Sequence, residues 1–213
     1  MEVGVTRTII AACVWLLASC GPQALVLPEE PVDRAATCGS VTAASERAAT
    51  AVGAPLSLQA IERVLHYPML AGSSGKSFSP DVAAAVQKRM SELQDSIVEG
   101  KWRDLIPACK AAFPATAIDQ VTLPPDRFAA QLGCDELGDF LLSSLEAQEE
   151  YLNELGEYRQ LTNKLEMTVA AGLRSRAGSD SDARQEERRK ALATMAKAGP
   201  PVAVMRACLV RFG

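Results

Sequence analysis

The chain has 213 residues, a formal net charge of −4 and 48% hydrophobic residues. This mild acidity argues against nucleic acid as a partner, because phosphate backbones require clustered Lys and Arg side chains. Aromatic residues make up only 5% and no long alternating apolar and polar run occurs, so helices are favoured over sheets. A chain of this length can bury one good core, which predicts one domain or at most two.

The chain begins with an apolar segment of the kind that directs export. Arg7 precedes an uninterrupted apolar run over residues 9–17, and Ala18 and Ser19 follow it. A basic start, a brief apolar run and a small-residue exit are typical of a signal peptide. The run is much shorter than the roughly 20 apolar residues of a membrane-spanning helix. An ordinary secretory signal, or a buried helix, is the alternative interpretation.

The end of this segment carries a lipoprotein motif. Leu17-Ala18-Ser19-Cys20 resembles the lipobox of bacterial lipoproteins, in which a branched apolar residue and two small residues precede a cysteine. The resemblance implies that a peptidase cuts before Cys20, whose sulfur then carries diacylglycerol and whose new amino group is acylated, for example with palmitate. It implies a place in the bacterial cell envelope, lipid-anchored to the inner or outer membrane and facing the periplasm. It covers only the targeting segment, and the mature domain matches no family that we can name.

The cysteines predict a disulfide framework. After Cys13 leaves with the signal and Cys20 is lipidated, an even number remains, which suits an exported chain with two disulfides. The four candidates are Cys38, Cys109, Cys134 and Cys208. If the helices on either side of residues 114–125 form a hairpin, Cys109 and Cys134 lie at similar distances from its turn. We therefore expect a Cys109–Cys134 bond and a Cys38–Cys208 bond, although the sequence allows all three pairings, or four small buried residues.

The region after Cys20 divides into a tether and a domain. Residues 21–37 carry three prolines and little periodicity, which indicates a linker. The expected organisation is a lipoprotein signal peptide at 1–19, the lipidated cysteine and tether at 20–37, and one helical domain at 38–213. The first helices are expected at residues 40–52 and 58–66.

Helix signals continue through the middle of the chain. Ser79 and Pro80 are typical of a helix start, and the apolar spacing that follows reaches Ile97. Pro107 predicts a kink or a fresh helix start, because proline lacks the backbone donor. Pro114 is expected to end that element, with a loop over residues 115–124.

The longest helical pattern runs over residues 126–176. Gly133, Gly138 and Gly156 are the expected places for a break or bend, because a straight helix of that length would extend roughly 75 Å. Gly178 should close the pattern. Asp182 and Gln185 are expected to form a capping box for the next helix.

The interruption at residues 199–201 then precedes a last helix, with Cys208 beside its apolar face. The predicted fold is therefore an all-α antiparallel helical bundle of about four to six helices, stapled by disulfides.

Three motifs offer chemistry that the surrounding residues do not support. Residues 70–77 end like a phosphate-binding loop, but Leu70 stands where that motif requires glycine. Asp180 and Asp182 begin like a calcium loop that lacks its later ligands, and helix capping explains them better. A group of glutamates could bind a hard cation, but no Glu-x-x-His pair accompanies it, so we expect a solvated acidic face. Its members are Glu146, Glu149, Glu150, Glu154 and Glu157.

The remaining candidate functional residues are the single histidine and one run of basic residues. His66 is the only histidine and no nucleophile motif surrounds it, so we expect an ordinary residue near a helix end. The basic run could meet anionic lipid headgroups, but Glu186 and Glu187 interrupt it and favour a solvated helix face. This run consists of Arg184, Arg188, Arg189 and Lys190.

These observations lead to three functional hypotheses. The first is a non-enzymatic, lipid-anchored envelope protein that binds another protein or stabilises an assembly, without metal, cofactor or nucleic acid. The second is a helical module that binds a small apolar or lipid ligand. The third is an enzyme that uses His66. A closed, packed core would favour the first, an apolar cavity the second, and His66 in a cleft beside a hydroxyl or carboxylate the third.

Overall fold

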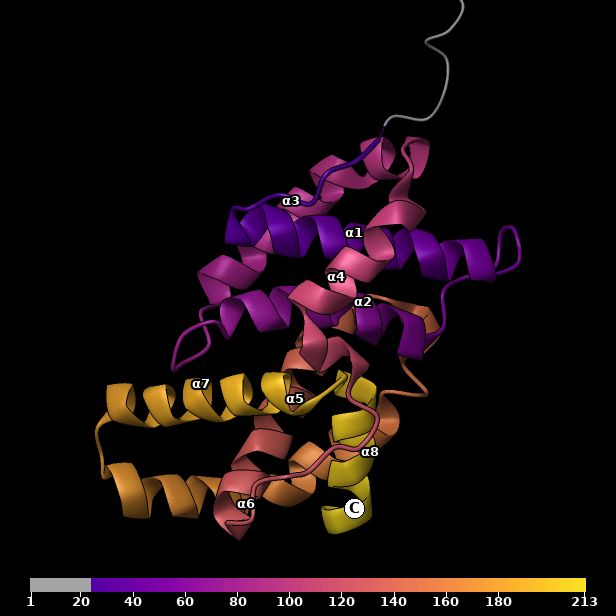
Figure 1. Cartoon of the computed structure of the whole chain (residues 1–213). Coiled ribbons are helices and arrows are strands. Elements are labelled where there is room, and N and C mark those ends of the chain that lie inside the picture. The colour runs from indigo at the N-terminus through magenta and orange to yellow at the C-terminus, as the bar shows by residue number, and fades with distance from the viewer. Residues whose placement is uncertain (1–23) are drawn as a thin grey trace, which may run out of the picture.

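A computed structural model describes residues 24–213 and shows an all-α protein (Figure 1). The predicted fold class, helical and stapled by two disulfides, is confirmed. The α-helices are α1 (Pro31–Ala49), α2 (Leu58–Gly72), α3 (Pro80–Glu99), α4 (Ile106–Ala112), α5 (Arg127–Leu145), α6 (Gly156–Ala177), α7 (Ser181–Ala198) and α8 (Pro201–Phe212). Short 3-10 helices are η2 (Trp102–Leu105), η3 (Pro114–Ala117) and η4 (Glu149–Tyr151).

The predicted signal peptide and Cys20 lie outside the described residues. Within residues 24–213, no helix is both long enough and apolar enough to cross a membrane.

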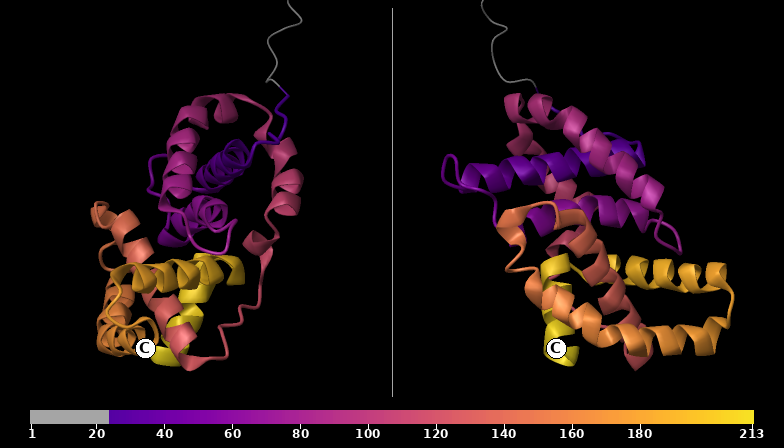
Figure 2. Two further views of the ribbon diagram at one scale, coloured as in Figure 1. Left: turned by 90° about the vertical axis from the view of Figure 1, so that its left-hand side faces the viewer. Right: turned by 180° about the vertical axis from the view of Figure 1, so that it is seen from behind.

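The helices form two halves that share α2. The N-terminal half contains α1 to α4 and lies above the C-terminal half, α5 to α8, in Figure 1. α1 and α2 lie side by side and run antiparallel, and α6 and α7 do the same (Figures 1 and 2). α2 contacts α1 and α3 within its own half, and α7 and α8 of the other half. Residues of α2 therefore belong to the cores of both halves.

α1 begins earlier than the sequence indicated. Pro31 occupies its first turn, where a missing N–H has no helical partner to lose. The Glu30 side chain caps the helix by accepting a hydrogen bond from the Asp33 N–H at 2.7 Å. The proline that we interpreted as part of a linker is a helix start.

The predicted boundary between tether and domain is therefore wrong. Residues 31–37 are helical and the segment from Ala35 to Val41 is buried. Upstream of α1, Leu25 and Leu27 already pack against the N-terminal core. The folded domain begins near residue 25 and not at residue 38.

α2 extends beyond His66, where the sequence predicted its end. It continues through Pro68 to Gly72 although proline removes one backbone hydrogen bond from a helix. Tyr67 is 5% exposed and Met69 is fully buried. Packing against neighbours on both sides outweighs the local preference for a break.

The middle of the chain follows the predictions closely. The Ser79 side chain caps α3 by accepting from the Val82 N–H at 3.4 Å. Pro107 lies in the first turn of α4, which is the predicted fresh start, and α4 ends before Pro114. A long connection over residues 118–126 then descends along the outside of the molecule to α5 (Figure 2).

The long pattern over residues 126–176 is divided between Leu145 and Gly156, so α5 and α6 fold back on each other. Gly156 therefore marks the break, whereas Gly133 and Gly138 lie inside α5. A Cβ on Gly138 would come within 2.6 Å of Thr162 Cγ2 on α6. This glycine allows close helix packing and does not bend α5.

The caps of the last helices differ in one detail from the prediction. Gly178 closes α6 with a φ of +63°, as expected of a glycine there. Asp180, and not a box of Asp182 and Gln185, caps α7: its carboxylate accepts from the N–H groups of Asp182 and Ala183 at 2.9 and 3.2 Å.

The structure contradicts the predicted disulfide pairing. Cys38 is bonded to Cys109, with their Cα atoms 5.4 Å apart, and Cys134 is bonded to Cys208 at 5.7 Å. The predicted hairpin does not form, because α4 and α5 belong to different halves and a long connection separates them. Each disulfide therefore closes one half.

Non-reducing peptide mapping should recover the Cys38–Cys109 and Cys134–Cys208 links. Replacing both cysteines of either pair by serine should lower the free energy of unfolding by about 4 kcal/mol, the loop-entropy value for sequence separations of 71 and 74. Denaturant unfolding would measure the loss. A linked peptide that joins Cys109 to Cys134 would contradict the arrangement of the halves.

Candidate functional site

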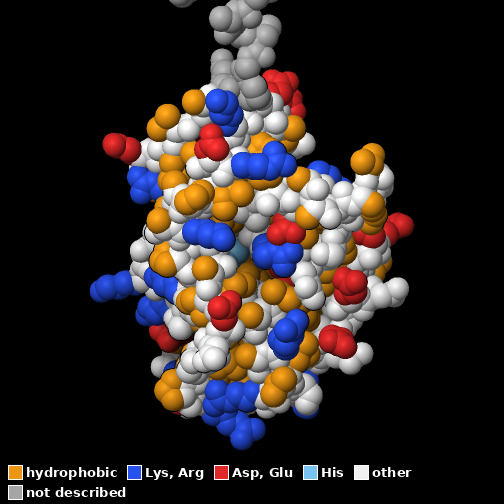
Figure 3. Space-filling view, turned by 45° about the vertical axis from the view of Figure 1, so that its right-hand side comes forward, with side chains coloured by type: hydrophobic (Ala, Val, Ile, Leu, Met, Phe, Trp, Pro, Cys, Tyr) orange, Lys and Arg blue, Asp and Glu red, His pale blue; other side chains and the backbone are white. Residues whose placement is uncertain are grey.

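A hollow of about 370 Å³ opens between α1, α2, α4 and η3. We call it the His66 hollow. Apolar side chains and the Cys109 end of a disulfide form part of its wall. Its polar side chains include Thr42, Glu46, Arg63, His66, Tyr67 and Lys110. Figure 3 shows this face, where a recessed patch in the colour of histidine lies between basic and acidic side chains.

His66 is held deep in this hollow by the neighbouring half. The side chain is 1% exposed, and its Nε2 donates a hydrogen bond to the backbone oxygen of Ala196 on α7 at 2.8 Å. The carbonyl can only accept, so Nε2 carries the proton and Nδ1 is the lone-pair nitrogen. Burial lowers the pKa of His66 to about 4, against the smaller opposing effect of the Ala196 hydrogen bond. The imidazole is therefore neutral at ordinary pH.

Arg63 and Glu46 form a two-point ion pair across α1 and α2. Arg63 Nε and Nη2 donate to the two carboxylate oxygens of Glu46 at 2.7 and 2.8 Å. The hydrogen bonds and the charge of Glu46 raise the pKa of Arg63. Bidentate geometry fixes both side chains in orientation. This pair joins α1 to α2 at the rim of the hollow.

Two hydroxyl groups of the hollow already donate hydrogen bonds within the protein. Thr42 Oγ1 donates to Tyr67 Oη at 3.0 Å, and Thr116 Oγ1 donates to the backbone oxygen of Phe113 at 2.7 Å. Nucleophilic catalysis requires a nucleophile hydrogen-bonded to a base. Within residues 24–213, the side chain of His66 bonds to a backbone oxygen and to no hydroxyl group.

A second buried polar pair joins the halves one turn before His66. Glu62 is fully buried, its Oε1 accepts from the Tyr158 hydroxyl on α6 at 2.8 Å, and its Oε2 has no partner. Burial raises the pKa of Glu62 to about 7, although the hydrogen bond from Tyr158 opposes the effect. Burial and the nearby Glu62 raise the pKa of Tyr158, which therefore remains a donor.

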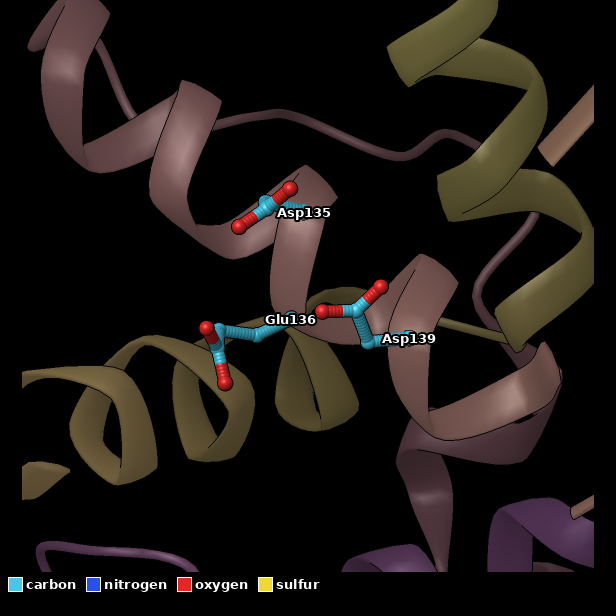
Figure 4. Close-up of side chains that lie close together, drawn as sticks. All are labelled: Asp135, Glu136 and Asp139. Carbon is cyan, nitrogen blue, oxygen red and sulfur yellow. The ribbon is translucent and has the colours of Figure 1, made fainter. Parts of the chain in front are cut away.

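Three acidic side chains gather on adjacent turns of α5 (Figure 4). Oxygens of Asp135, Glu136 and Asp139 lie within 4.8 Å of one another. Arg188 on α7 contacts Glu136 and lies 3.5 Å from Asp135 Oδ2. Burial, together with Asp139 and Glu136, raises the pKa of Asp135 to about 7. Carboxylate oxygens suit hard cations, but Arg188 already supplies a positive charge here, so the trio acts as a polar link between α5 and α7.

The other candidate residues from the sequence lie on the surface, in ion pairs or in a loop between helices. The five glutamates from Glu146 to Glu157 are exposed, and the basic run is largely paired with acidic neighbours. Residues 70–77 form the end of α2 and a loop docked on α7, where Lys197 Nζ donates to Gly75 O at 2.9 Å. The predicted helix-end histidine is wrong in position, because His66 lies inside α2.

The buried carboxylates of Glu62 and Asp135 were not among the residues that the sequence singled out. Glu62, together with Arg63, interrupts the apolar residues Ile61, Val64 and Leu65, and Asp135 follows a buried cysteine. A charged residue on an otherwise apolar helix face is a signal for a buried polar contact. Its partner, however, comes from another helix far along the chain and leaves no mark on local spacing.

Comparisons with known proteins do not assign the chain to a family. No protein family, curated protein or solved structure matches the chain.

The buried Glu62 predicts a pH-dependent stability difference. Between pH 4.5 and 7 the folded chain holds a proton on Glu62 that the unfolded chain has lost, so this carboxyl destabilises the fold as pH rises. Glu62→Gln keeps an acceptor for Tyr158 and cannot ionise. Relative to the parent, its free energy of unfolding should rise by about 3 kcal/mol between pH 4.5 and 8.

Denaturant unfolding of both proteins across that pH range measures this difference. The exposed Glu146→Gln is the control and should show no such trend. A Glu62→Gln difference that stays constant with pH would show that Glu62 titrates normally.

Proposed function

We propose that the chain is an exported, non-enzymatic protein of the bacterial cell envelope, anchored by lipid on Cys20 and acting through interaction with a partner or as a structural component. The observation that carries this proposal is the use of the cysteines. All four cysteines of residues 24–213 are in disulfides, one pair in each half. Disulfides of this kind persist in oxidising compartments and are rare in the cytosol of mesophiles.

The proposal of a non-enzymatic role is supported by the histidine and cysteine side chains of residues 24–213, which are residue types that often perform catalysis. The sole histidine is buried with Nε2 bonded to a backbone carbonyl. The cysteines are held in disulfides and cannot act as thiolate nucleophiles. These groups support folding and binding, not acyl transfer.

An anchor at Cys20 would hold the domain close to the membrane. Leu25 already packs against the core, so only the intervening residues separate the lipid from the folded domain. At about 3.5 Å per residue these five steps reach at most roughly 17 Å. A partner of this protein would therefore be met near the membrane surface.

A helical binding module is the second candidate function. The His66 hollow favours it, because its volume is of ligand size and one of its lining residues, His66, has a ring nitrogen that Ala196 does not occupy. The lining is mixed and includes an ion pair and a lysine. This composition suits a small polar ligand better than the apolar or lipid ligand that the sequence suggested.

Cys20→Ser should release the protein from membranes and abolish incorporation of labelled palmitate, because the sulfur that carries diacylglycerol is lost. Cys13→Ser removes a cysteine of the predicted signal segment and is the matched control, with attachment unchanged. Fractionation after a high-salt wash and lipid labelling measure both variants. Lipid labelling that persists in Cys20→Ser would overturn the anchor assignment.

A further inference from the structure

The His66 hollow presents one hydrogen-bond acceptor in a buried position. Nε2 is committed to Ala196, and within the described part of the chain Nδ1 has no hydrogen-bond partner. His66 is one of the residues that line the hollow, although it is only 1% exposed. Because Nδ1 is a lone-pair nitrogen in this tautomer, a molecule in the hollow satisfies it by offering an N–H or O–H group.

The same hollow presents a donor and an uncompensated positive charge. Tyr67 Oη accepts from Thr42, so the Tyr67 hydroxyl hydrogen remains available to donate. Arg63 and Glu46 neutralise each other. Lys110 is exposed and forms no ion pair within residues 24–213. Its ammonium group leaves one net positive charge beside the hollow.

We propose that the His66 hollow binds a small carboxylate that also carries an N–H or O–H donor. The donor bonds to Nδ1 of His66, and the carboxylate accepts from the Tyr67 hydroxyl and the Lys110 ammonium group. The inference deepens the binding-module candidate and rests on it, and it does not depend on the lipid anchor.

The size and charge of the hollow narrow the ligand class. A volume of about 370 Å³ accommodates a small molecule, from the size of a hydroxy acid or an amino acid up to the size of a dipeptide. A simple cation is disfavoured by Lys110, and a purely apolar molecule would leave His66 Nδ1 and the Tyr67 hydroxyl unsatisfied. The apolar wall, which includes Val41 and Ile106, suits a short aliphatic side chain.

His66 also provides the probe for the experiment, because it is the only histidine in the chain. Full-length protein without a polyhistidine tag, labelled with ¹⁵N-histidine, gives one pair of ring signals. Titration with lactate at constant ionic strength should shift the Nδ1 signal saturably at millimolar concentrations. Propionate lacks the hydroxyl donor and lactamide lacks the negative charge, so each should bind at least about fivefold more weakly than lactate.

Substitutions test the two other contacts. Lys110→Ala should weaken lactate binding about tenfold, because it removes a charge-assisted hydrogen bond. Lys88→Ala on α3 is the matched control and should bind as the parent does. Tyr67→Phe keeps the edge-to-face packing on Phe113 and removes only the hydroxyl, so it should weaken binding several-fold.

Three results would overturn the proposal. They are no saturable shift of Nδ1 with lactate, equal responses to lactate and propionate, or equal lactate affinity in Lys110→Ala and the parent. Any of these outcomes would leave release of Cys20→Ser from membranes unaffected, so failure of the ligand site and failure of the lipid anchor are distinguishable.

Discussion

The burial of α2 between two disulfide-closed halves is the constraint on which the rest of the structure depends. Tyr67 belongs to the N-terminal core, whereas Leu58 and Met69 belong to the large core of the C-terminal half. Neither disulfide crosses between the halves. Their association therefore depends on packing and on hydrogen bonds between the halves, and α2 supplies two buried ones through Glu62 and His66.

The position of α2 also creates the candidate site. Glu62 and His66 are one turn apart and face the C-terminal half, where Tyr158 and Ala196 bond to them. Arg63 and Tyr67 repeat the same spacing on the side of α1. The C-terminal half thereby fixes the ring of His66 through Ala196, while His66 lines a hollow of the N-terminal half. A binding residue positioned by the interface is coupled to the integrity of that interface.

Local signals in the sequence predicted much of the fold and little of the site. The Ser79 cap, the fresh start at Pro107 and the glycine stop at Gly178 depend on neighbouring residues alone, and all three are confirmed. Pro31 misled because a proline breaks or starts a helix according to its context, and α2 likewise continues through Pro68, beyond its predicted end. The disulfide pairing and the partners of Glu62 and His66 depend on contacts between distant segments, which spacing along the chain does not record.

Native-state hydrogen exchange on the full chain, with both disulfides intact, tests the central role of α2 most directly. If α2 is shared by the two cores, its amides should exchange only through the same large opening that exposes α5, with equal free energy and equal denaturant dependence. Exchange of α2 together with α1 at a much lower free energy, while α5 remains protected, would contradict this account and show that the halves open independently.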